Sequence, residues 1–172
     1  IAVVIIFSLI FRVATVKGES MENTLFTSDK VIISNLGYTP ERGDIVVVSR
    51  NANNSVEDAA TSKEPIIKRG IAAGGQTVDI DFERGVVSVD GVELDEPYAK
   101  MPTTTKYDVQ FPLYVPEGYI FVLGDNRGNS ADSRVFGAVD ASAITGHAVF
   151  RYWPLFRTNG DGSIQISVGP LG

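Results

Sequence analysis

The chain of 172 residues contains no cysteine and only one histidine, His147. The absence of cysteine excludes a thiol nucleophile, a disulfide framework and a thiolate metal site. A single histidine cannot form a zinc site with other histidines, and we predict neither a metal nor an organic cofactor. Basic residues are also scarce, because 15 Lys and Arg stand against 21 Asp and Glu and leave a net charge of −6. This balance argues against a nucleic-acid partner, which usually requires a basic face.

The most apolar stretch is Ile1–Phe11, which reads IAVVIIFSLIF. As a helix, these 11 residues would measure roughly 16 Å, about half the hydrocarbon thickness of a bilayer. A buried strand or core helix is one alternative. The apolar part of a signal peptide is another, although no charged segment or small-residue cleavage site flanks the run. We favour the C-terminal part of a truncated transmembrane helix over residues 1–14, with Arg12 and Lys17 at the membrane–water interface.

The rest of the chain predicts short β-strands separated by turn residues. Asp90-Gly91 separates Val86–Val89 from Val92–Leu94, and this dipeptide is a strong hairpin signal because both turn positions tolerate positive φ. The other predicted strands, which are rich in β-branched and aromatic residues, are Lys30–Ser34, Asp44–Ser49, Pro65–Arg69, Thr77–Phe82, Tyr119–Leu123 and Gly146–Trp153. We therefore expect an all-β fold with a folded, barrel-like sheet.

Two residues suggest chemistry. Ser20 lies in the motif Gly18-Glu19-Ser20-Met21, and Lys68 lies in the motif Ile67-Lys68-Arg69-Gly70. Taken singly, a serine in such a position is usually a turn residue and a lysine in a strand is usually solvated. A hydroxyl and an amine with no histidine in either motif, however, suggest a serine nucleophile activated by a neutral lysine.

A lysine base must be buried. A free lysine has a pKa of about 10.4, so roughly one in 2,500 is neutral at pH 7. The amine must therefore lose solvation before it can accept a proton. In a β-strand, Lys68 shares a face with Ile66, whereas Arg69 shares the opposite face with Ile67. We expect Lys68 to point inward and Arg69 to reach solvent.

Four segments resemble, in order, the motif set of the bacterial type I signal peptidases, the membrane-anchored Ser–Lys proteases that remove secretory signal peptides. These segments are 18–25 (GESMENTL), 42–48 (RGDIVVV), 67–75 (IKRGIAAGG) and 124–134 (GDNRGNSADSR). Each short motif is common by chance, whereas the segment 124–134 is highly specific. The resemblance extends over nearly the whole chain, including the apolar run before Ser20.

The resemblance implies a role for each residue of the catalytic centre. Ser20 would be the nucleophile, and its backbone amide would donate a hydrogen bond to the oxyanion. Lys68 would be the general base, and Ser130 would orient the lysine amine by a hydrogen bond. Some family members carry Ser or Thr at the position of Gly18 as a second oxyanion donor, which glycine cannot supply.

The resemblance also implies a set of supporting residues. Asp132 and Arg134 would pair and brace the loop that holds Ser130, and Asp125 and Arg127 would help to fix the same loop. The segment Arg42-Gly43-Asp44 matches a structural motif on a neighbouring strand.

The resemblance further implies the partners and the location of the protein. The substrates would be the signal peptides of secretory preproteins, with small side chains at the first and third positions before the scissile bond. The protein would be a monomer that contacts membrane lipid and binds no nucleic acid. It would cross the bacterial plasma membrane once, with its catalytic domain on the extracytoplasmic side, which the lack of cysteine also fits.

Two positions depart from the family pattern. Asn23 stands where members usually have proline, which frees φ after the nucleophile. Gly75-Gln76 stands where members usually have Gly-Asp, which removes a carboxylate from that turn. We expect reduced rigidity rather than lost chemistry.

Several alternatives compete with this interpretation. Segment 124–134 is also typical of a plain turn, whereas a calcium loop is disfavoured because Arg127 occupies a ligand position. His147 is expected to be a strand residue, although a triad of Ser20, His147 and a carboxylate is an alternative. A self-cleaving repressor would share the Ser–Lys chemistry, and a silent β-domain would bind peptides without cutting them.

The predicted domain organisation follows from these motifs. Residues 1–14 would be the end of the transmembrane anchor, and residues 15–80 and 119–158 would form the catalytic β-domain. Residues 81–118 would form a small β-hairpin insertion, and residues 159–172 a flexible tail.

Overall fold

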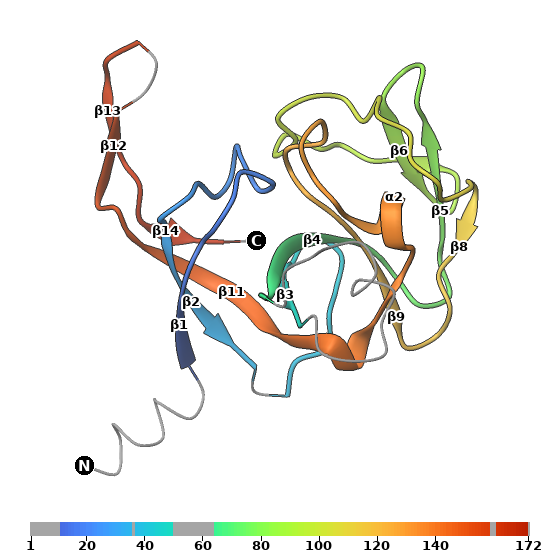
Figure 1. Cartoon of the computed structure of the whole chain (residues 1–172), viewed down its shortest axis with the longest axis horizontal. Coiled ribbons are helices and arrows are strands. Elements are labelled where there is room, and N and C mark those ends of the chain that lie inside the picture. The colour runs from blue at the N-terminus through green and yellow to red at the C-terminus, as the bar shows by residue number, and fades with distance from the viewer. Residues whose placement is uncertain (1–10, 36, 50–63, 159–160, 172) are drawn as a thin grey trace.

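The structure is a computed structural model that describes residues 11–35, 37–49, 64–158 and 161–171. Its largest element is an 8-stranded antiparallel sheet in the order β1-β2-β11-β3-β4-β9-β10, with β14 paired to β11. The strands are β1 (Phe11–Thr15), β2 (Lys30–Ser34), β3 (Ile45–Val48), β4 (Ile66–Ala73), β9 (Tyr119–Leu123), β10 (Val139–Asp140), β11 (Ile144–Trp153) and β14 (Gly169–Pro170). Figure 1 shows how this sheet curls, with β11 running along it between β2 and β3.

The centre of the sheet is buried on both faces. All four residues of β3 are buried, and they alternate between two hydrophobic clusters. Ile45 and Val47 pack with Met21 and Leu25, whereas Val46 and Val48 pack on the other side. Because successive side chains of a strand point to opposite faces, only a strand covered on both sides can be apolar at every position. The curled sheet therefore holds β3 and its neighbour β4 inside the molecule.

A second sheet of four strands is inserted between β4 and β9. Its order is β7-β6-β5-β8, formed by β5 (Thr77–Asp81), β6 (Val86–Val89), β7 (Val92–Glu93) and β8 (Leu113–Tyr114). The Asp90-Gly91 hairpin is confirmed, with Val89 opposite Val92 and with positive φ at Asp90 (52°) and Gly91 (78°). The insertion begins earlier than the predicted residue 81, because Thr77–Asp81 pairs within this sheet and not within the large one.

The all-β prediction is confirmed, including strands at each predicted position. The only helices in the described part of the chain are two short ones, α2 (Ser133–Phe136) and η1 (Ala141–Ala143).

The predicted transmembrane helix over residues 1–14 is wrong at its C-terminal end. Phe11–Thr15 is strand β1, paired with β2 from Phe11 opposite Ser34 to Thr15 opposite Lys30. β-pairing prevails here because Val13 and Thr15 are β-branched and the partner strand KVIIS is a strong β-former. Residues 1–10 lie outside the described residues. Among the described residues, no helix has the length and apolarity needed to cross a bilayer.

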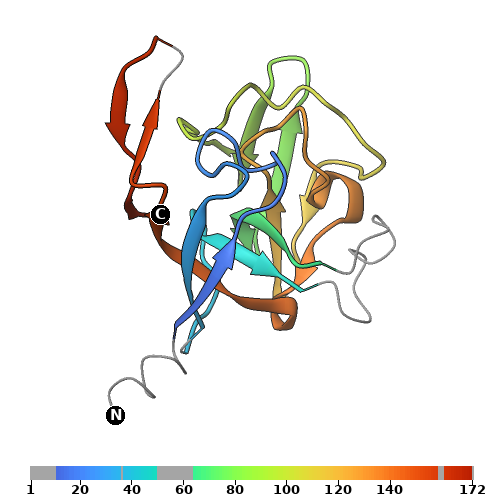
Figure 2. The ribbon, with the colours of Figure 1, turned by 60° about the vertical axis from the view of Figure 1, so that its left-hand side comes forward.

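The C-terminal region contains β-structure where a flexible tail was predicted. Strand β12 (Phe156–Thr158) pairs with β13 (Ile164–Ile166), and β14 joins the large sheet through Phe150 opposite Pro170. Figures 1 and 2 show the β12–β13 hairpin standing away from the rest of the ribbon. The Gly-rich composition that predicted flexibility does not prevent the flanking segments from pairing.

Candidate active site

Ser20 lies in a compact turn between β1 and β2. The turn is closed by backbone hydrogen bonds from Glu22 N to Glu19 O (3.1 Å) and from Leu25 N to Met21 O (2.8 Å). Met21 and Leu25 follow Ser20 in this turn and are buried in the hydrophobic core, so they anchor the turn to the body of the protein. Gly18 has a φ of 81°, a conformation that favours glycine at the start of the turn. The local sequence thus anchors the turn that carries the Ser20 hydroxyl.

Lys68 reaches this hydroxyl from the middle of the curled sheet. Its strand β4 pairs with β3, which places Lys68 opposite Val46. The lysine Nζ donates hydrogen bonds to Ser20 Oγ (2.8 Å) and to the Ile67 carbonyl (3.0 Å). Lys68 is only 3% exposed, so the expected inward direction is confirmed. A pocket of about 150 Å³ opens onto both residues, between Lys17 and the segment from Glu64 to Ile67.

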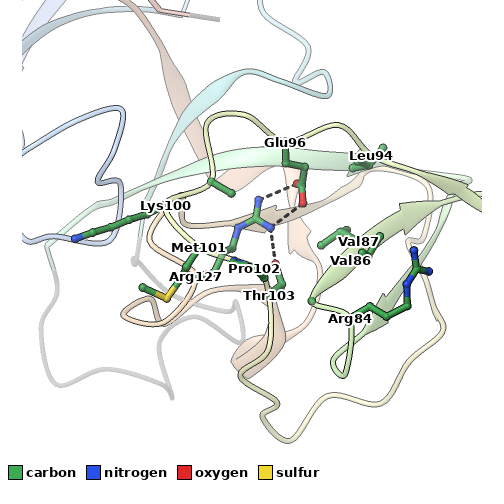
Figure 3. Close-up of a pocket in the computed structure, with 12 residues that line it drawn as sticks. Arg84, Val86, Val87, Leu94, Glu96, Lys100, Met101, Pro102, Thr103 and Arg127 are labelled. Carbon is green, nitrogen blue, oxygen red and sulfur yellow. Dashed lines mark hydrogen bonds and ion pairs between the residues drawn. The ribbon is translucent and has the colours of Figure 1, made fainter.

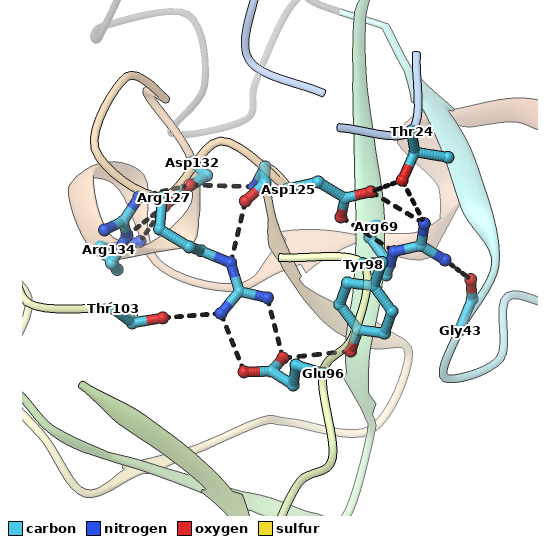
Figure 4. A network of polar contacts seen from close by, with 11 residues as sticks. Thr24, Gly43, Arg69, Glu96, Tyr98, Thr103, Asp125, Arg127, Asp132 and Arg134 are labelled. Carbon is cyan, nitrogen blue, oxygen red and sulfur yellow. Dashed lines mark hydrogen bonds and ion pairs between the residues drawn. The ribbon is translucent and has the colours of Figure 1, made fainter. Parts of the chain in front are cut away.

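The expectation that Arg69 reaches solvent is wrong. Arg69 is 5% exposed and forms a bidentate pair with Asp125, from Nε to Oδ1 (2.9 Å) and from an Nη to Oδ2 (2.8 Å). It also donates to the Gly43 carbonyl (2.7 Å), and its guanidinium lies 4.1 Å from the centre of the Tyr98 ring. Figure 4 shows Arg69 enclosed by these groups. The segment around Tyr98, which follows strand β7, covers the face of β4 that carries Arg69. Strand periodicity cannot reveal that this segment lies there.

The loop 124–134 holds the nucleophile turn from its other side. The Asn126 amide N–H donates to the Ser20 carbonyl (3.0 Å), and the Asn126 side chain donates to the Glu19 carbonyl (3.1 Å). The Asp125 carboxylate accepts from the Thr24 hydroxyl (2.5 Å). Three side chains of this loop and turn therefore fix the position of Ser20 relative to β4.

Asp132 and Arg134 form the ion pair that the resemblance implied. Both side chains are fully buried, and Arg134 donates to Asp132 through Nε (2.8 Å) and an Nη (2.8 Å). Asp132 also caps helix α2 and accepts from the Gly124 amide (3.0 Å). A buried charge pair of this kind is retained only when further hydrogen bonds satisfy it, as they do here.

Two charged residues of this loop pair with residues outside it. Asp125 pairs with Arg69, and Arg127 pairs with Glu96. Arg127 is 1% exposed and pairs with Glu96 through both terminal nitrogens (2.9 and 2.8 Å), and it donates to the Thr103 hydroxyl (2.6 Å). Figure 3 shows these contacts beside a pocket of about 370 Å³ in the small-sheet region. The insertion is thereby tied to the loop that braces the nucleophile.

The sequence reasoning missed Glu96, Tyr98 and Thr103. Tyr98 lies between Arg69 and Arg127, and its hydroxyl donates to Glu96 (3.1 Å). Burial, and then the charge and hydrogen bond of Glu96, raise the pKa of the Tyr98 phenol. These residues lie in an irregular segment without a motif, so no local signal marks them.

Ser130 does not make the hydrogen bond implied for it. Its Oγ is buried and has no hydrogen-bond partner among the described residues. The hydroxyl instead lies against Gly124, where an added Cβ would collide with both Ser130 and the Ser20 carbonyl. Its role towards Lys68 stays a prediction.

The alternative partner His147 is not at this site. It lies on β11, and its ring stacks on Tyr38 with the centroids 4.0 Å apart. Gln76, one of the two departures, holds its turn by accepting from the Ala73 amide (3.0 Å) and donating to Asp90 (3.1 Å). An amide therefore supplies turn contacts at the position where a carboxylate is usual.

Comparisons with known proteins decide the family. The family model described as "Signal peptidase, peptidase S26" matches residues 1–153. The chain belongs to this signal peptidase family. It is therefore a peptidase, and the family removes signal peptides.

Individual relatives agree with this assignment. The chain is 36% identical over 172 residues to "Probable signal peptidase I-1" of Synechocystis sp., covering 96% of this chain and 85% of that protein. It is 31% identical to "Signal peptidase IB" of Staphylococcus aureus, covering 90% and 87%. It is 34% identical to "Thylakoidal processing peptidase 1, chloroplastic" of Arabidopsis thaliana, covering 86% of this chain but only 45% of the plant protein.

A solved structure also resembles this peptidase. A crystal structure of a signal peptidase I from Enterococcus faecalis V583 superimposes with a TM-score of 0.50 at 29% identity. The match covers 64% of this chain and 97% of the other. The curled all-β architecture is thus that of a signal peptidase I.

Proposed function

We propose that this chain is a membrane-anchored serine endopeptidase that removes N-terminal signal peptides through a Ser20–Lys68 dyad. The observation that carries the proposal is the 2.8 Å hydrogen bond from Lys68 Nζ to Ser20 Oγ. An exposed lysine would be protonated and could not accept a proton, whereas Lys68 is 3% exposed. A nucleophile with its base in hydrogen-bond reach is the arrangement that covalent catalysis needs.

The proposed reaction proceeds in two steps. Neutral Lys68 takes the proton of Ser20, whose Oγ attacks the scissile carbonyl carbon. The Ser20 amide donates to the resulting oxyanion. The lysine ammonium then gives its proton to the leaving amine as the C–N bond breaks, which leaves an acyl-enzyme and neutral Lys68. In the second step Lys68 takes a proton from water, the hydroxide oxygen attacks the ester, and Ser20 recovers its proton as the signal peptide leaves.

The cavities beside the dyad fit a peptide with small side chains. The pocket at Ser20 and Lys68 measures about 150 Å³. A larger groove of about 350 Å³ adjoins it and shares the lining residues Lys17, Glu64, Pro65 and Ile67. An extended peptide places alternate side chains on one face, so its first and third residues before the scissile bond can enter these two cavities.

The apolar sequence IAVVIIFSLI, immediately before β1, supports the membrane anchor. Ser20 follows this run closely, which would keep the nucleophile near the bilayer surface on the extracytoplasmic side, where a signal peptide leaves the membrane.

Cleavage of a purified precursor, with the cut site mapped by mass, tests the proposal. Ser20→Ala and Lys68→Met should each lower kcat at least ~10³-fold while leaving the fold intact. The matched controls Ser88→Ala and Lys106→Met change residues outside the site and should cleave normally. Turnover by Lys68→Met at the rate of Lys106→Met would exclude the lysine base.

A further inference from the structure

Two charged side chains lie where the two cavities beside the dyad meet. Lys17 and Glu64 line both the pocket of about 150 Å³ at Ser20 and Lys68 and the adjoining groove of about 350 Å³. Lys17 follows strand β1, and Glu64 precedes strand β4. Lys17 Nζ lies 2.5 Å from a carboxylate oxygen of Glu64, so this ion pair joins the two chain segments that flank the groove. A peptide that fills both cavities must therefore pass the Lys17–Glu64 pair.

The charged groups of this pair lie at the mouth of the groove and not on its floor. The side chains of Lys17 and Glu64 are 69% and 59% exposed. Ile33 and Val47, which line the same groove, are only 8% and 6% exposed and belong to the hydrophobic core. The groove thus has an apolar floor and a charged mouth.

The Lys17–Glu64 pair can exchange partners readily. Water screens the attraction between exposed charges, so a pair of this kind contributes little to the stability of a fold. The Arg69–Asp125 pair, by contrast, has side chains only 6% and 0% exposed and holds the nucleophile turn in place. A charged substrate can therefore separate Lys17 from Glu64 without disturbing the fold.

An extended peptide presents one side chain to this mouth. Under the proposed function, on which this proposal rests, the first and third residues before the scissile bond enter the two cavities. Successive side chains of an extended chain point to opposite sides, so the second residue points away from the apolar floor. It also lies between the two cavities along the peptide, where Lys17 and Glu64 meet. The second residue before the scissile bond is therefore the one that contacts the ion pair.

The charges around the groove favour an acidic residue at this position. A substrate carboxylate would replace Glu64 as the partner of Lys17, and a substrate ammonium would replace Lys17 as the partner of Glu64. These two exchanges balance, because each forms one exposed pair in place of another. Arg12 removes the balance: among the described residues that line the groove, Arg12 and Lys17 are cations, whereas Glu64 is the only carboxylate. We propose that Arg12, Lys17 and Glu64 select signal peptides with an acidic residue at the second position before the scissile bond.

Three precursors that differ only at this second residue, as Ala, Glu or Lys, test the proposal, with the cut site mapped by mass. The parent protein should cleave the Glu precursor with a kcat/KM about five-fold higher than the Lys precursor, which is the size of effect that exposed charge pairs have. The difference should lie mainly in KM, because the second residue does not contact the reacting atoms. In roughly 1 M salt, where the Debye length falls to about 3 Å, the ratio should approach one. Equal kcat/KM values for the Glu and Lys precursors at low salt would overturn the proposal.

Variants of the three charged residues should change this ratio in opposite directions. Lys17→Glu leaves one cation and two carboxylates in the groove and should invert the preference, whereas Lys17→Arg keeps the charge and should keep the parental ratio. Glu64→Gln should raise the preference for the Glu precursor, and Arg12→Gln should bring the ratio close to one. A parental ratio in Lys17→Glu would contradict the proposal.

Two controls separate the charge of the groove from the charge of the whole protein. Lys106→Glu makes the same change in net charge as Lys17→Glu, but on an exposed residue that does not line the groove, and it should keep the parental ratio. Lys17→Glu combined with Glu64→Lys exchanges the two charges without changing their sum, so the preference for the Glu precursor should return. An inverted ratio in Lys106→Glu would show that the overall charge sets the preference and would overturn the proposal.

The Ala precursor distinguishes a failure of this proposal from a failure of the proposed function. If the parent cleaves it, Ser20→Ala does not, and the Glu and Lys precursors are cleaved equally, then the dyad stands and the selection at the second residue is wrong. If Ser20→Ala cleaves the Ala precursor as fast as the parent, the proposed function fails and the selection fails with it.

Discussion

Lys68 and Arg69 are neighbours on opposite faces of β4, yet both are buried, with exposures of 3% and 5%. Each finds a polar partner on its own side. Lys68 donates to the Ser20 hydroxyl (2.8 Å), and Arg69 forms a bidentate pair with Asp125. Asp125 in turn accepts from Thr24, in the turn that carries Ser20. The two faces of one strand thus hold the nucleophile turn at two points.

Arg69→Met should destabilise the protein by about 3–5 kcal/mol, because it leaves the fully buried Asp125 carboxylate without its partner. The free energy of unfolding, measured by denaturant titration, checks this. Arg84→Met removes the exposed pair with Glu93 and should leave stability nearly unchanged, because water screens the attraction between these two side chains. Equal unfolding midpoints for the two variants would show that the Arg69–Asp125 pair does not stabilise the fold.

Gly124→Ala should lower turnover by on the order of 10²-fold, because misplacement of catalytic groups by about 1 Å has effects of that size. An added Cβ would collide with the Ser130 hydroxyl and would lie 2.5 Å from the Ser20 carbonyl oxygen. Gly128→Ala is the matched control, since its Cβ would meet only the flexible Met101 side chain (2.7 Å to the sulfur). Equal kcat/KM for the two alanine variants would contradict this account of Gly124.

Ser130→Ala should reduce kcat on the order of 10²-fold while changing stability by less than about 1 kcal/mol. The expected change in the free energy of unfolding is small because the buried Ser130 hydroxyl makes no hydrogen bond among the described residues, so its removal breaks none. The kinetic effect follows if the hydroxyl turns to Lys68 during catalysis. Kinetics and unfolding should be measured on the same preparation. An unchanged kcat would remove Ser130 from the proposed mechanism.

Tyr98 should make stability fall at alkaline pH. Burial, followed by the charge of Glu96, raises the pKa of its phenol in the folded state. The unfolded chain therefore loses this proton first. The stabilisation is complete below the unfolded pKa of about 10 and declines as pH rises above that value. Unfolding free energies of the parent and of Tyr98→Phe should converge as pH rises through about 9 to 11. Tyr38, whose pKa is also raised, is common to both proteins and cancels. A constant difference in unfolding free energy between the parent and Tyr98→Phe over this pH range would contradict the expected effect of Tyr98 ionisation on stability.

The strands could be predicted because their signals are local. The β-branched run KVIIS predicts β2 at its observed bounds, and the Asp90-Gly91 step predicts the β6–β7 hairpin through its positive φ values. The end of the predicted anchor was wrong because an apolar run does not show whether its last residues pair with a distant strand. Phe11–Thr15 forms a strand because Lys30–Ser34 lies beside it and pairs with it.

The sequence by itself determined which residues have the chemistry: a serine in an anchored turn, a lysine in an apolar strand and a loop rich in charges and small residues. Only the tertiary structure decided their partners. Arg69 is buried because the segment around Tyr98 covers its face of β4, and Arg127 pairs with Glu96 from the same segment. Side-chain alternation states which face a residue occupies, but whether that face meets water depends on chain segments far away in the sequence.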